Sequence, residues 1–468
     1  MSSPAQEFLR QAIEKSSDPA LRAKLRRNIA SYRAAVDRGM KRFVDWEAAR
    51  RYNQNLKWEA VNHLDRYLVE FEENVKARGG HVFWAETAQD ARDYICNLAK
   101  ERGVKRVVKA KSMATEEIHL NHALEERGIE AVETDLGEFI VQMRGEAPYH
   151  IVTPAMHLTR KEVAETFRAK LGPIDTDDPP QLVAMARRAL RQKFFSAEMG
   201  ISGANFLVAD SGMIAITTNE GNADLSVTLP NIHVALAGIE KVIPRIEDLA
   251  WLWPALATSG TGQGITVYNT LIGGPRQPGE QDGPEEFHVV LLDNGRTELL
   301  ADAEQRDVLH CIRCGACLNA CPVYRTIGGH AYGTVYQGPI GSVLTPHLRG
   351  PEFAHLSYAS SLCGACTSVC PVKIDLHHHL LHNRRNATTR KGSAAERAAF
   401  RAWSWAMQSP GRYRMASRLV RAGMGVVRGL GLGGSALDPM RAWAQYRTAM
   451  EMPAKSFREL WRENAGHE

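Results

Sequence analysis

Seven of the eight cysteines in the chain lie between residues 311 and 370, in two related groups. The first group has the spacing C-x2-C-x2-C-x3-C and is followed by Pro322, and the second has C-x2-C-x3-C followed by Pro371. The groups consist of Cys311, Cys314, Cys317 and Cys321, and of Cys363, Cys366 and Cys370. Bacterial ferredoxins use the first spacing to bind 4Fe-4S clusters, and the last cysteine of the run ligates the other cluster. The pattern therefore predicts two adjacent clusters and electron transfer between them.

If the last cysteine of each group binds the other group's cluster, the two clusters receive different numbers of cysteine ligands. We expect the first cluster to be bound by Cys311, Cys314, Cys317 and Cys370, and the second by Cys321, Cys363 and Cys366. The second cluster lacks a fourth cysteine because Ser360 stands where its motif would begin. Three alternatives fit this gap: a 4Fe-4S cluster with a non-cysteine ligand such as Ser360 or a histidine, a 3Fe-4S cluster, or a 4Fe-4S cluster with one open iron. The sequence does not choose between them.

Other chemistries of clustered cysteines fit less well. Disulfides are rare in the cytosol, and structural zinc usually takes two C-x2-C pairs or a mixed cysteine and histidine set. Four histidines, His377, His378, His379 and His382, follow the second group. His378 and His382 would lie one helical turn apart and could share a metal, or one histidine could complete the second cluster. We favour a solvated helical face for them, and a buried, structural role for the isolated Cys96.

Length and charge limit the other function classes. The chain has 468 residues and a formal net charge of +5, which predicts two or three domains and disfavours a nucleic-acid-binding protein. The first fifteen residues lack the apolar segment of a signal peptide, and no run of about 18 apolar residues is present. We therefore expect a cytoplasmic protein without a transmembrane segment and without a nucleic acid partner.

Hydrophobic periodicity divides the chain. Strand-like and helix-like segments alternate between residues 80 and 300, which indicates an α/β layer with a largely parallel sheet. One helix is expected over residues 114–128, and a tight turn at Asp210-Ser211-Gly212. We expect a helical region (1–75), an α/β domain (76–300), a cluster domain (301–390) and a basic helical tail (391–468). The tail is expected to pack on a partner, with peripheral membrane contact as the alternative.

Candidate ligand-binding residues in the α/β region follow strand-like segments. Lys111 and Ser112 precede a helix and could hold a carboxylate or phosphate, although an ordinary helix cap by Ser112 or Thr115 is favoured. Glu220, in the loop Thr217–Asn222, could act as a base or a carboxylate ligand, with a plain turn as the alternative.

Two further sets of residues are expected to be structural. His233 and His288 are interpreted as satisfied core histidines. The string Ser259–Gly264 has glycine spacing like a nucleotide-binding motif but lacks its strand-to-helix context, so we interpret it as a flexible loop.

Two pairs of strings carry a family resemblance. HCIRCGACLNACPVYRTIGGH and SLCGACTSVCPVKIDLHHHL surround the cysteines, while VVKAKSMATEEIHLNHALEERGIEAVETDLGEFIVQ and SGANFLVADSGMIAITTNEGNADLSV lie in the α/β region. Together they resemble the lactate utilization protein B family, the iron–sulfur subunits of bacterial L-lactate oxidation. The resemblance covers nearly the whole chain, in the family's order of a lactate utilization (LUD) domain, a dicluster ferredoxin domain and a helical tail.

The resemblance implies a fold and a function. The LUD domain would fold like ribose-phosphate isomerase and CoA transferases, and the ferredoxin domain would be all-α. The protein would act with two other subunits in oxidising L-lactate to pyruvate, as a subunit of the oxidoreductase and not as an enzyme by itself, and it would pass electrons to an unidentified acceptor. The family's cysteines carry over onto the same seven positions. The alternatives are a subunit for another 2-hydroxy acid such as glycolate, and a non-redox binding module with structural metal.

Overall fold

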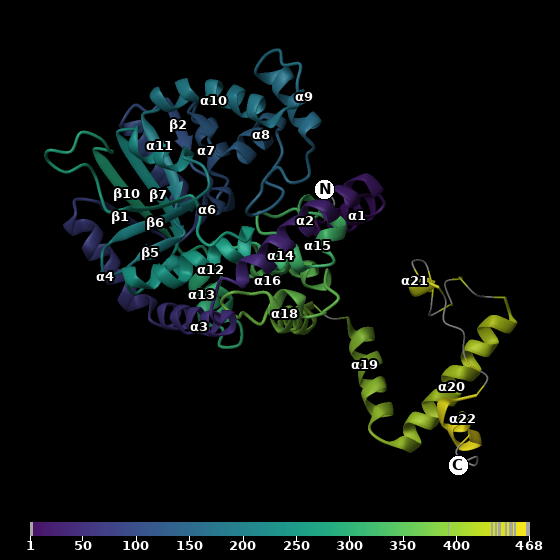
Figure 1. The fold of residues 1–468 in the computed structure, drawn as a ribbon. Helices are drawn as coiled ribbons and strands as arrows, with labels where there is room; N and C mark the ends of the chain where they lie inside the picture. The colour runs from purple at the N-terminus through teal and green to yellow at the C-terminus, as the bar shows by residue number, and fades with distance from the viewer. Residues whose placement is uncertain are drawn as a thin grey trace. The chain divides into compact units, whose positions relative to one another are not determined.

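The computed structural model describes residues 3–391, 393–431, 434–435, 438, 441–444, 447–448, 453 and 455–464. The chain divides into two units, residues 1–387 and 388–468, and each is described by itself. The first unit holds two sheets and the cysteine segment, and the second is helical (Figure 1).

A parallel sheet forms the centre of the first unit. Among the described residues it has six strands in the order β1-β10-β7-β4-β2-β3, and every pairing is parallel. Each residue of the central strand β7 is buried, as expected for a parallel strand covered on both faces. The predicted parallel α/β layer is thus confirmed. The strands are β1 (His81–Ala85), β2 (Arg106–Lys109), β3 (Glu130–Glu133), β4 (Met199–Gly203), β7 (Ile232–Gly238) and β10 (Glu286–Leu292).

Helices cover both faces of this sheet. On one face the apolar side of α5, with Ile95 at its centre, packs on Val234 of β7. On the other face Phe71 of α4 packs on Val289 of β10. A third apolar cluster joins α8, α9 and α10 to strands β2 and β3. The helices here are α5 (Ala88–Glu101), α6 (Met113–Glu117), α7 (Leu120–Glu125), α8 (Leu136–Arg144), α9 (Arg160–Lys170), α10 (Pro179–Phe195) and α11 (Asn222–Thr228).

A smaller sheet lies beside the first, in the order β8-β5-β6-β9. Strands β5 and β6 are antiparallel and are joined at Asp210-Ser211-Gly212, so the predicted turn is confirmed. The sequence predicted these strands but not that they leave the parallel sheet. The elements are β5 (Phe206–Val208), β6 (Met213–Thr218), the 3-10 helix η1 (Ile239–Lys241), β8 (Val242–Ile243), the 3-10 helix η2 (Ile246–Asp248), α12 (Leu249–Thr261) and β9 (Tyr268–Ile272).

The N-terminal residues are helical, as predicted, and join the sheets to the cysteine segment. Leu25 and Ile29 of α2 share one hydrophobic core with Leu252 of α12 and with the cysteines. The Lys57 amino group of α3 is buried and donates to the carbonyl oxygens of Glu240 and Val242, at 2.7 and 3.2 Å. The helices are α1 (Pro4–Ser16), α2 (Pro19–Met40), α3 (Trp46–Asn62) and α4 (Leu64–Ala77).

Short helices and turns, without an assigned strand among the described residues, make up the chain from 296 to 391. The backbone there is shaped by the cysteine loops rather than by a sheet. The elements are α13 (Arg296–Ala301), η3 (Arg306–His310), α14 (Ala316–Ala320), α15 (Tyr324–Ile327), η4 (His330–Tyr332), α16 (Gly338–Leu348), η5 (Pro351–Tyr358), α17 (Ala365–Ser368) and α18 (Leu376–Lys391).

Two sequence expectations are wrong. Residues 114–128 form two helices, α6 and α7, because His119 between them takes a left-handed conformation with φ of 52°. Ser259–Gly264 is not a flexible loop, since its first three residues end α12 and Gly262 closes the helix with φ of 77°. A Cβ on Gly262 would lie 2.3 Å from the backbone of Ala35 in α2, so this glycine permits close helix packing.

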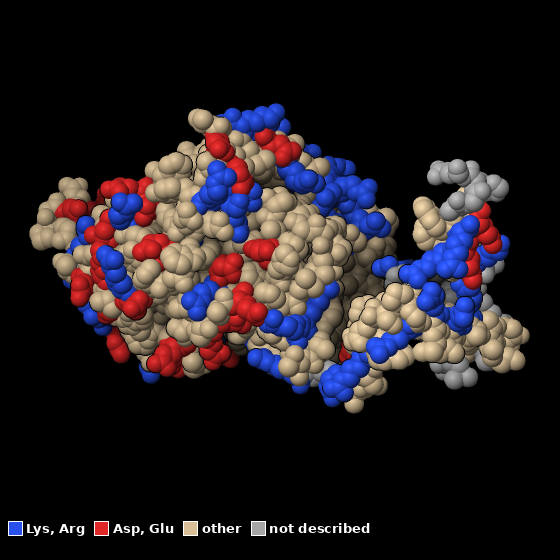
Figure 2. All heavy atoms as spheres, turned by 90° about the horizontal axis from the view of Figure 1, so that it is seen from below, with Lys and Arg blue, Asp and Glu red and all other residues tan. Residues whose placement is uncertain are grey.

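The second unit is helical and basic, as predicted. It contains α19 (Ala394–Met407), α20 (Pro410–Gly429), α21 (Arg441–Ala444) and α22 (Phe457–Asn464). Apolar side chains such as Phe400, Trp403 and Trp461 are exposed on it, and Figure 2 shows basic side chains over much of its visible face. None of the described helices combines the length and apolarity needed to cross a membrane.

A buried charge network connects the parallel sheet to the cysteine segment. Arg296 donates to Glu117 at 2.8 Å and to Glu240 at 2.6 Å, and Arg313 donates to the second oxygen of Glu240 at 3.0 Å. Burial raises the pKa of Glu240, but Arg296 and Arg313 outweigh it and lower the pKa to about 2. Gly238 is required here, since a Cβ would lie 2.0 Å from the Glu240 carboxylate. These residues come from four segments, so the network fixes their relative positions.

Replacing Arg296 by leucine tests this network. The side chain is 2% exposed, so Arg296→Leu leaves Glu117 and Glu240 buried without their main partner. We expect the free energy of unfolding to fall by about 3–5 kcal/mol, measured by urea denaturation of the full chain. The control is Arg102→Leu, which breaks an ion pair whose side chains are 45% and 28% exposed and should cost about 1 kcal/mol or less. Equal losses in the two variants would contradict the assigned role.

Candidate metal centre and adjoining cavity

Six of the seven clustered cysteines belong to, or pack against, the largest hydrophobic core of the first unit. Five of them are buried, Cys311 is half-buried, and Cys363 is exposed. All eight cysteines of the chain are among the described residues and are free thiols, so no disulfide framework is present there.

The two cysteine groups have the same backbone conformation. Arg313 and Leu362, each one residue before a cysteine, have φ of 60° and 56°. Gly315 and Gly364, each one residue after that cysteine, have φ of 77° and 74°. Left-handed conformations are rare for residues such as arginine and leucine. Their recurrence at matching positions shows that the groups are structural repeats, including the group that lacks one cysteine.

Ser360 occupies the position that Cys311 occupies in the first repeat. The backbone N–H of Arg313 donates to Cys311 Sγ at 3.4 Å, and that of Leu362 donates to Ser360 Oγ at 3.1 Å. Arg384 holds this second loop by donating to the carbonyl oxygen of Ser360 at 3.0 Å. The serine hydroxyl therefore points in the direction in which the missing thiol would point.

Mutual electrostatic effects show which thiols are close. Burial raises the pKa of the Cys314 thiol, and Cys370 and Cys311 raise it further. Burial raises the pKa of Cys317 well above its usual value, and Cys311 and Cys314 add to this effect. Burial raises the pKa of Cys370 to about 12, with a contribution from Cys311. Cys366 of the second cysteine group also contributes to the rise at Cys317, so the thiols of the two groups influence one another.

Cys321, Cys363 and Cys366 are linked by similar effects. Burial raises the pKa of Cys321, and Cys363 adds to it. Burial also raises the pKa of Cys366 to about 11, with the next contribution from Cys321. Cys363 differs, because N–H donation from Ala365 and a hydrogen bond with Ser361 lower its pKa. It is the thiol of this group that faces solvent.

The spacing of the thiols is wider than a single zinc ion needs. Within the described residues, the groups of three or more metal-ligating side chains whose ligand atoms lie within 4.8 Å of one another contain no cysteine. A tetrahedral zinc with Zn–S bonds of about 2.3 Å brings its sulfurs to about 3.8 Å apart. No three of the described thiols are therefore gathered as closely as one tetrahedral zinc ion requires.

Unpaired donors beside the thiols fit an iron–sulfur cluster. Arg313 Nη1 and the Tyr332 hydroxyl are buried without a hydrogen-bond partner. Apart from burial itself, Cys311 has the largest effect on the pKa of Arg313 and raises it. Cys321 has the corresponding effect on the pKa of Tyr332 and also raises it. An iron–sulfur cluster would supply sulfur acceptors there, and hydrogen bonds to cluster sulfur tune its potential. The residues present therefore fit 4Fe-4S clusters.

The histidines after the second group do not form one solvated face, which corrects the expectation. His379 is 3% exposed and lies 2.9 Å from Asp307, because this side of α18 packs on η3. The potential ligands that gather in threes here are Asp375, His377 and His378. His377 is hydrogen-bonded to the Thr367 hydroxyl at 2.8 Å.

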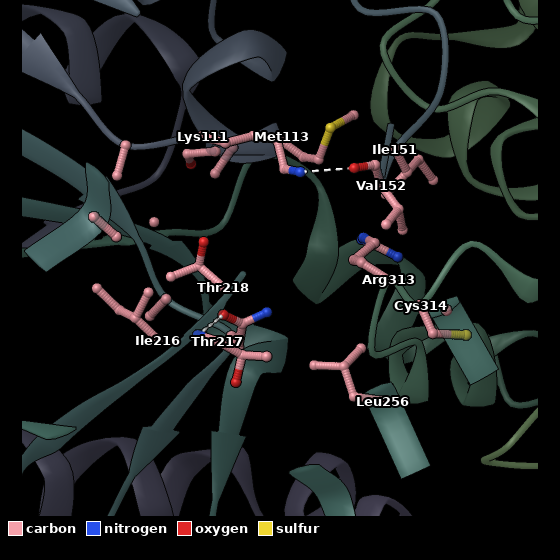
Figure 3. Close-up of a pocket in the computed structure, with 18 of the residues that line it drawn as sticks. Lys111, Met113, Ile151, Val152, Ile216, Thr217, Thr218, Leu256, Arg313 and Cys314 are labelled. Atoms are coloured by element: carbon pink, nitrogen blue, oxygen red, sulfur yellow. Dashed lines mark hydrogen bonds between the residues drawn. The ribbon is translucent and has the colours of Figure 1, made fainter. Parts of the chain in front are cut away.

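A cavity of about 360 Å³ lies at the carboxyl ends of β2, β4 and β7. Figure 3 shows Lys111 and Met113 on one wall, Thr217 and Thr218 on a second, and Arg313 with Cys314 opposite. The structure thus brings the candidates Lys111, Ser112 and Glu220 together around one space. It also confirms Ser112 as a helix cap, since its hydroxyl accepts from the Thr115 N–H at 3.4 Å.

Two other candidates lie outside the cavity. His233 is buried and hydrogen-bonded to Ser202 at 2.8 Å, and burial lowers its pKa to about 3. His288 is hydrogen-bonded to Tyr94 at 2.8 Å. Both are buried core histidines, as interpreted from the sequence, but only His288 is satisfied at both ring nitrogens, because Nδ1 of His233 is buried without a hydrogen-bond partner. Cys96 is likewise buried, on the face of α5 that packs on the parallel sheet.

Sequence reasoning missed Glu240, Lys241 and Arg313, which also line the cavity. Glu240 and Lys241 follow a buried strand without any motif, so no local signal identified them. Arg313 lies inside the cysteine motif, and its position could have indicated a residue that faces a cluster.

Comparisons with known proteins agree with this organisation. Residues 68–292 match the LUD domain, residues 307–374 the 4Fe-4S dicluster domain, and residues 377–465 the C-terminal domain of lactate utilisation protein B. Lactate utilization protein B 2 of Bacillus mycoides is 45% identical over 415 residues, covering 88% of this chain and 87% of that protein. Lactate utilization protein B of Bacillus thuringiensis is 45% identical over 426 residues, covering 90% and 89%. A DUF162 family structure from Deinococcus radiodurans matches at 12% identity over 49% of this chain and 98% of that chain, with a TM-score of 0.27, and no conclusion rests on it.

Arg50 of α3 holds the second cysteine group and provides a test of the site's rigidity. It donates to the carbonyl oxygens of Cys370 and Thr367, at 2.9 and 3.3 Å. Losing hydrogen bonds from a charged group costs about 1.5–3 kcal/mol, so the loop that buries Cys370 should open more often without Arg50. In metal-free protein, Arg50→Ala should therefore speed alkylation of Cys370 about tenfold or more. Mass spectrometry after timed iodoacetamide treatment measures this rate. Arg51→Ala, which removes a 56% exposed neighbour, should leave it unchanged; an equal effect would refute the role of Arg50.

Proposed function

This chain belongs to the lactate utilization protein B family, and we propose that it is the iron–sulfur electron-transfer subunit of a cytoplasmic complex that oxidises L-lactate to pyruvate. The observation that carries the proposal is the repeated left-handed backbone at Arg313 and Gly315 and at Leu362 and Gly364, because it presents the cysteines of two related loops as a two-cluster ferredoxin requires. The subunit would work with two partner subunits, support growth on lactate, and not be catalytic by itself. The LUD domain would share the fold of ribose-phosphate isomerase and CoA transferases.

In this proposal, the first cluster is held by Cys311, Cys314, Cys317 and Cys370, and the second by Cys321, Cys363 and Cys366. Each cluster, when bound, accepts and releases one electron. The chain's own residues set the environment of each. The first site is walled by buried side chains and adjoins the cavity, whereas the second includes the exposed Cys363. Electrons would therefore pass between the interior site and a partner docked at the surface near Cys363.

Ser360 is our candidate for the fourth ligand of the second cluster. Its hydroxyl has the same local hydrogen bond as the Cys311 thiol, in a loop of the same backbone conformation. Among the histidines, His377 is occupied by Thr367 and Asp375, and His379 by Asp307. This arrangement favours a serine-ligated 4Fe-4S cluster over a 3Fe-4S cluster or an open iron.

Two alternatives to the proposal are a subunit for a different substrate and a binding module without a redox role. A subunit for another 2-hydroxy acid, such as glycolate, would use the same clusters and differ only in its substrate. A binding module with structural zinc is disfavoured by the wide spacing of the thiols.

Removing one cysteine of the first site tests electron transfer. Cys314→Ala should abolish one of two paramagnetic signals in dithionite-reduced protein and stop reduction by L-lactate in the presence of the partner subunits. Cys96→Ala is the matched control, because Cys96 is also buried but belongs to α5 in a separate hydrophobic core. Unchanged reduction by lactate in Cys314→Ala would contradict the proposal. Replacing lactate by glycolate in the same assay separates the two substrates.

Two substitutions at position 360 test the fourth ligand. Ser360→Ala should lose about one of eight irons per chain and give a 3Fe-4S signal in the oxidised state, because three thiolates hold three irons. Ser360→Cys should keep all irons and change the midpoint potential of one cluster only. Iron analysis and electron paramagnetic resonance measure both, with Ser368→Ala as an exposed-serine control. Full iron content with an unaltered spectrum in Ser360→Ala would rule out serine ligation.

A further inference from the structure

The cavity beside the cysteine segment has the location of a ligand site in open α/β sheets. In the parallel sheet β2 has β3 on one side and β4 on the other. The chain passes from β2 to the edge strand β3 and then crosses back over β2 to β4, so the strand order reverses between β2 and β4. Ligands of such sheets bind at the carboxyl ends of the strands at this reversal. Lys111 and Ser112 follow β2 there, and Gly203 ends β4.

The charges around the cavity are not all paired with one another. Arg296 and Arg313 bind Glu240, and Lys111 lies 3.7 Å from Asp135 and donates to the Val152 carbonyl oxygen at 2.9 Å. Lys241 also lines the cavity, but its ammonium group has no hydrogen bond and no ion pair with any residue in the described part of the chain. It is held there by the 3-10 helix η1, directly after Glu240.

The unpaired Lys241 favours binding of an anion in the cavity, and the acidic residues there limit how much negative charge that anion can carry. Lys241 and Arg313 both line the cavity and repel each other, and an anion bound between them would reduce that repulsion. Asp135 and Glu220 line the cavity as well and would repel a polyanion such as a nucleotide. Thr217 and Thr218 offer hydroxyl groups suited to a small polar substituent. A monoanion with one or two oxygen substituents meets these conditions.

From this arrangement we propose that the cavity binds a small 2-hydroxy or 2-oxo monocarboxylate, with its carboxylate on Lys241. The proposal rests on the proposed function and adds a role for the LUD domain. Arg313 and Cys314 form one wall, so the bound acid lies next to the first cluster site while the Cys314 sulfur points away from β6. The LUD domain would thus hold substrate or product beside the electron-transfer centre.

A simpler role for Lys241 is that of a counter-ion for the first cluster. Cys311 is among the charges that act on Lys241, as it is for the buried Lys57. The two roles predict different results. A counter-ion affects the cluster potential only, whereas a ligand residue determines carboxylate binding.

The test is equilibrium binding to the anaerobically purified full chain with both clusters, measured by calorimetry with pyruvate, L-lactate, L-lactamide and inorganic phosphate. We expect saturable binding of pyruvate or lactate, none of the uncharged lactamide, and a change in one cluster's paramagnetic signal on binding. Lys241→Gln should weaken binding at least about tenfold with cluster content unchanged, since a charge-assisted hydrogen bond is lost. Lys241→Arg should retain binding, and the exposed-lysine control Lys105→Gln should match the wild type.

Three results would overturn the inference: no saturable carboxylate binding, binding that Lys241→Gln leaves unchanged, or phosphate bound more tightly than both acids. A shift in cluster potential without any carboxylate binding would identify Lys241 as a counter-ion. Reduction of the clusters by lactate and the partner subunits is a separate readout. If that reduction occurs without carboxylate binding here, the proposed function stands and this site is refuted; binding without reduction would refute the function alone.

Discussion

The Glu240 carboxylate, held between Arg296 and Arg313, is the interaction on which the arrangement of the first unit depends. Glu240 follows the central strand β7 directly, in η1. Arg296 begins α13, and Arg313 lies inside the first cysteine loop. A buried ion pair contributes little to stability against an apolar alternative, but breaking it leaves uncompensated charge. The network therefore specifies geometry: it fixes the cysteine loop against the carboxyl edge of the sheet.

That constraint explains why the cavity and the cysteine segment adjoin. Arg313 reaches Glu240 on one side and has an unpaired nitrogen near Cys311 on the other. One side chain thus contacts the sheet edge, the cavity and the first cluster site. The second site, with the exposed Cys363, is the one open to a partner. In the proposed function, electrons pass between an acid bound in the cavity and a partner subunit docked near Cys363. These positions do not determine the direction of that transfer.

The sequence predicted what depends on local spacing. Cysteine intervals, the alternation around residues 80–300 and the turn at Asp210-Ser211-Gly212 all act over a few residues, and the fold agrees with them. Features that depend on distant packing were missed. Gly262 closes a helix because α2 lies against it, His379 is buried because η3 covers it, and Lys241 lines a cavity through tertiary contacts alone. Lys111 and Glu220 were found as separate candidates, and only the structure places them around one space.

The most direct test of the account is the iron and acid-labile sulfide content of anaerobically purified full chain, together with its paramagnetic resonance spectrum after reduction. Two complete clusters predict about eight of each per chain and two signals in the reduced protein. Zinc in place of iron, with no signal on reduction, would contradict the electron-transfer account.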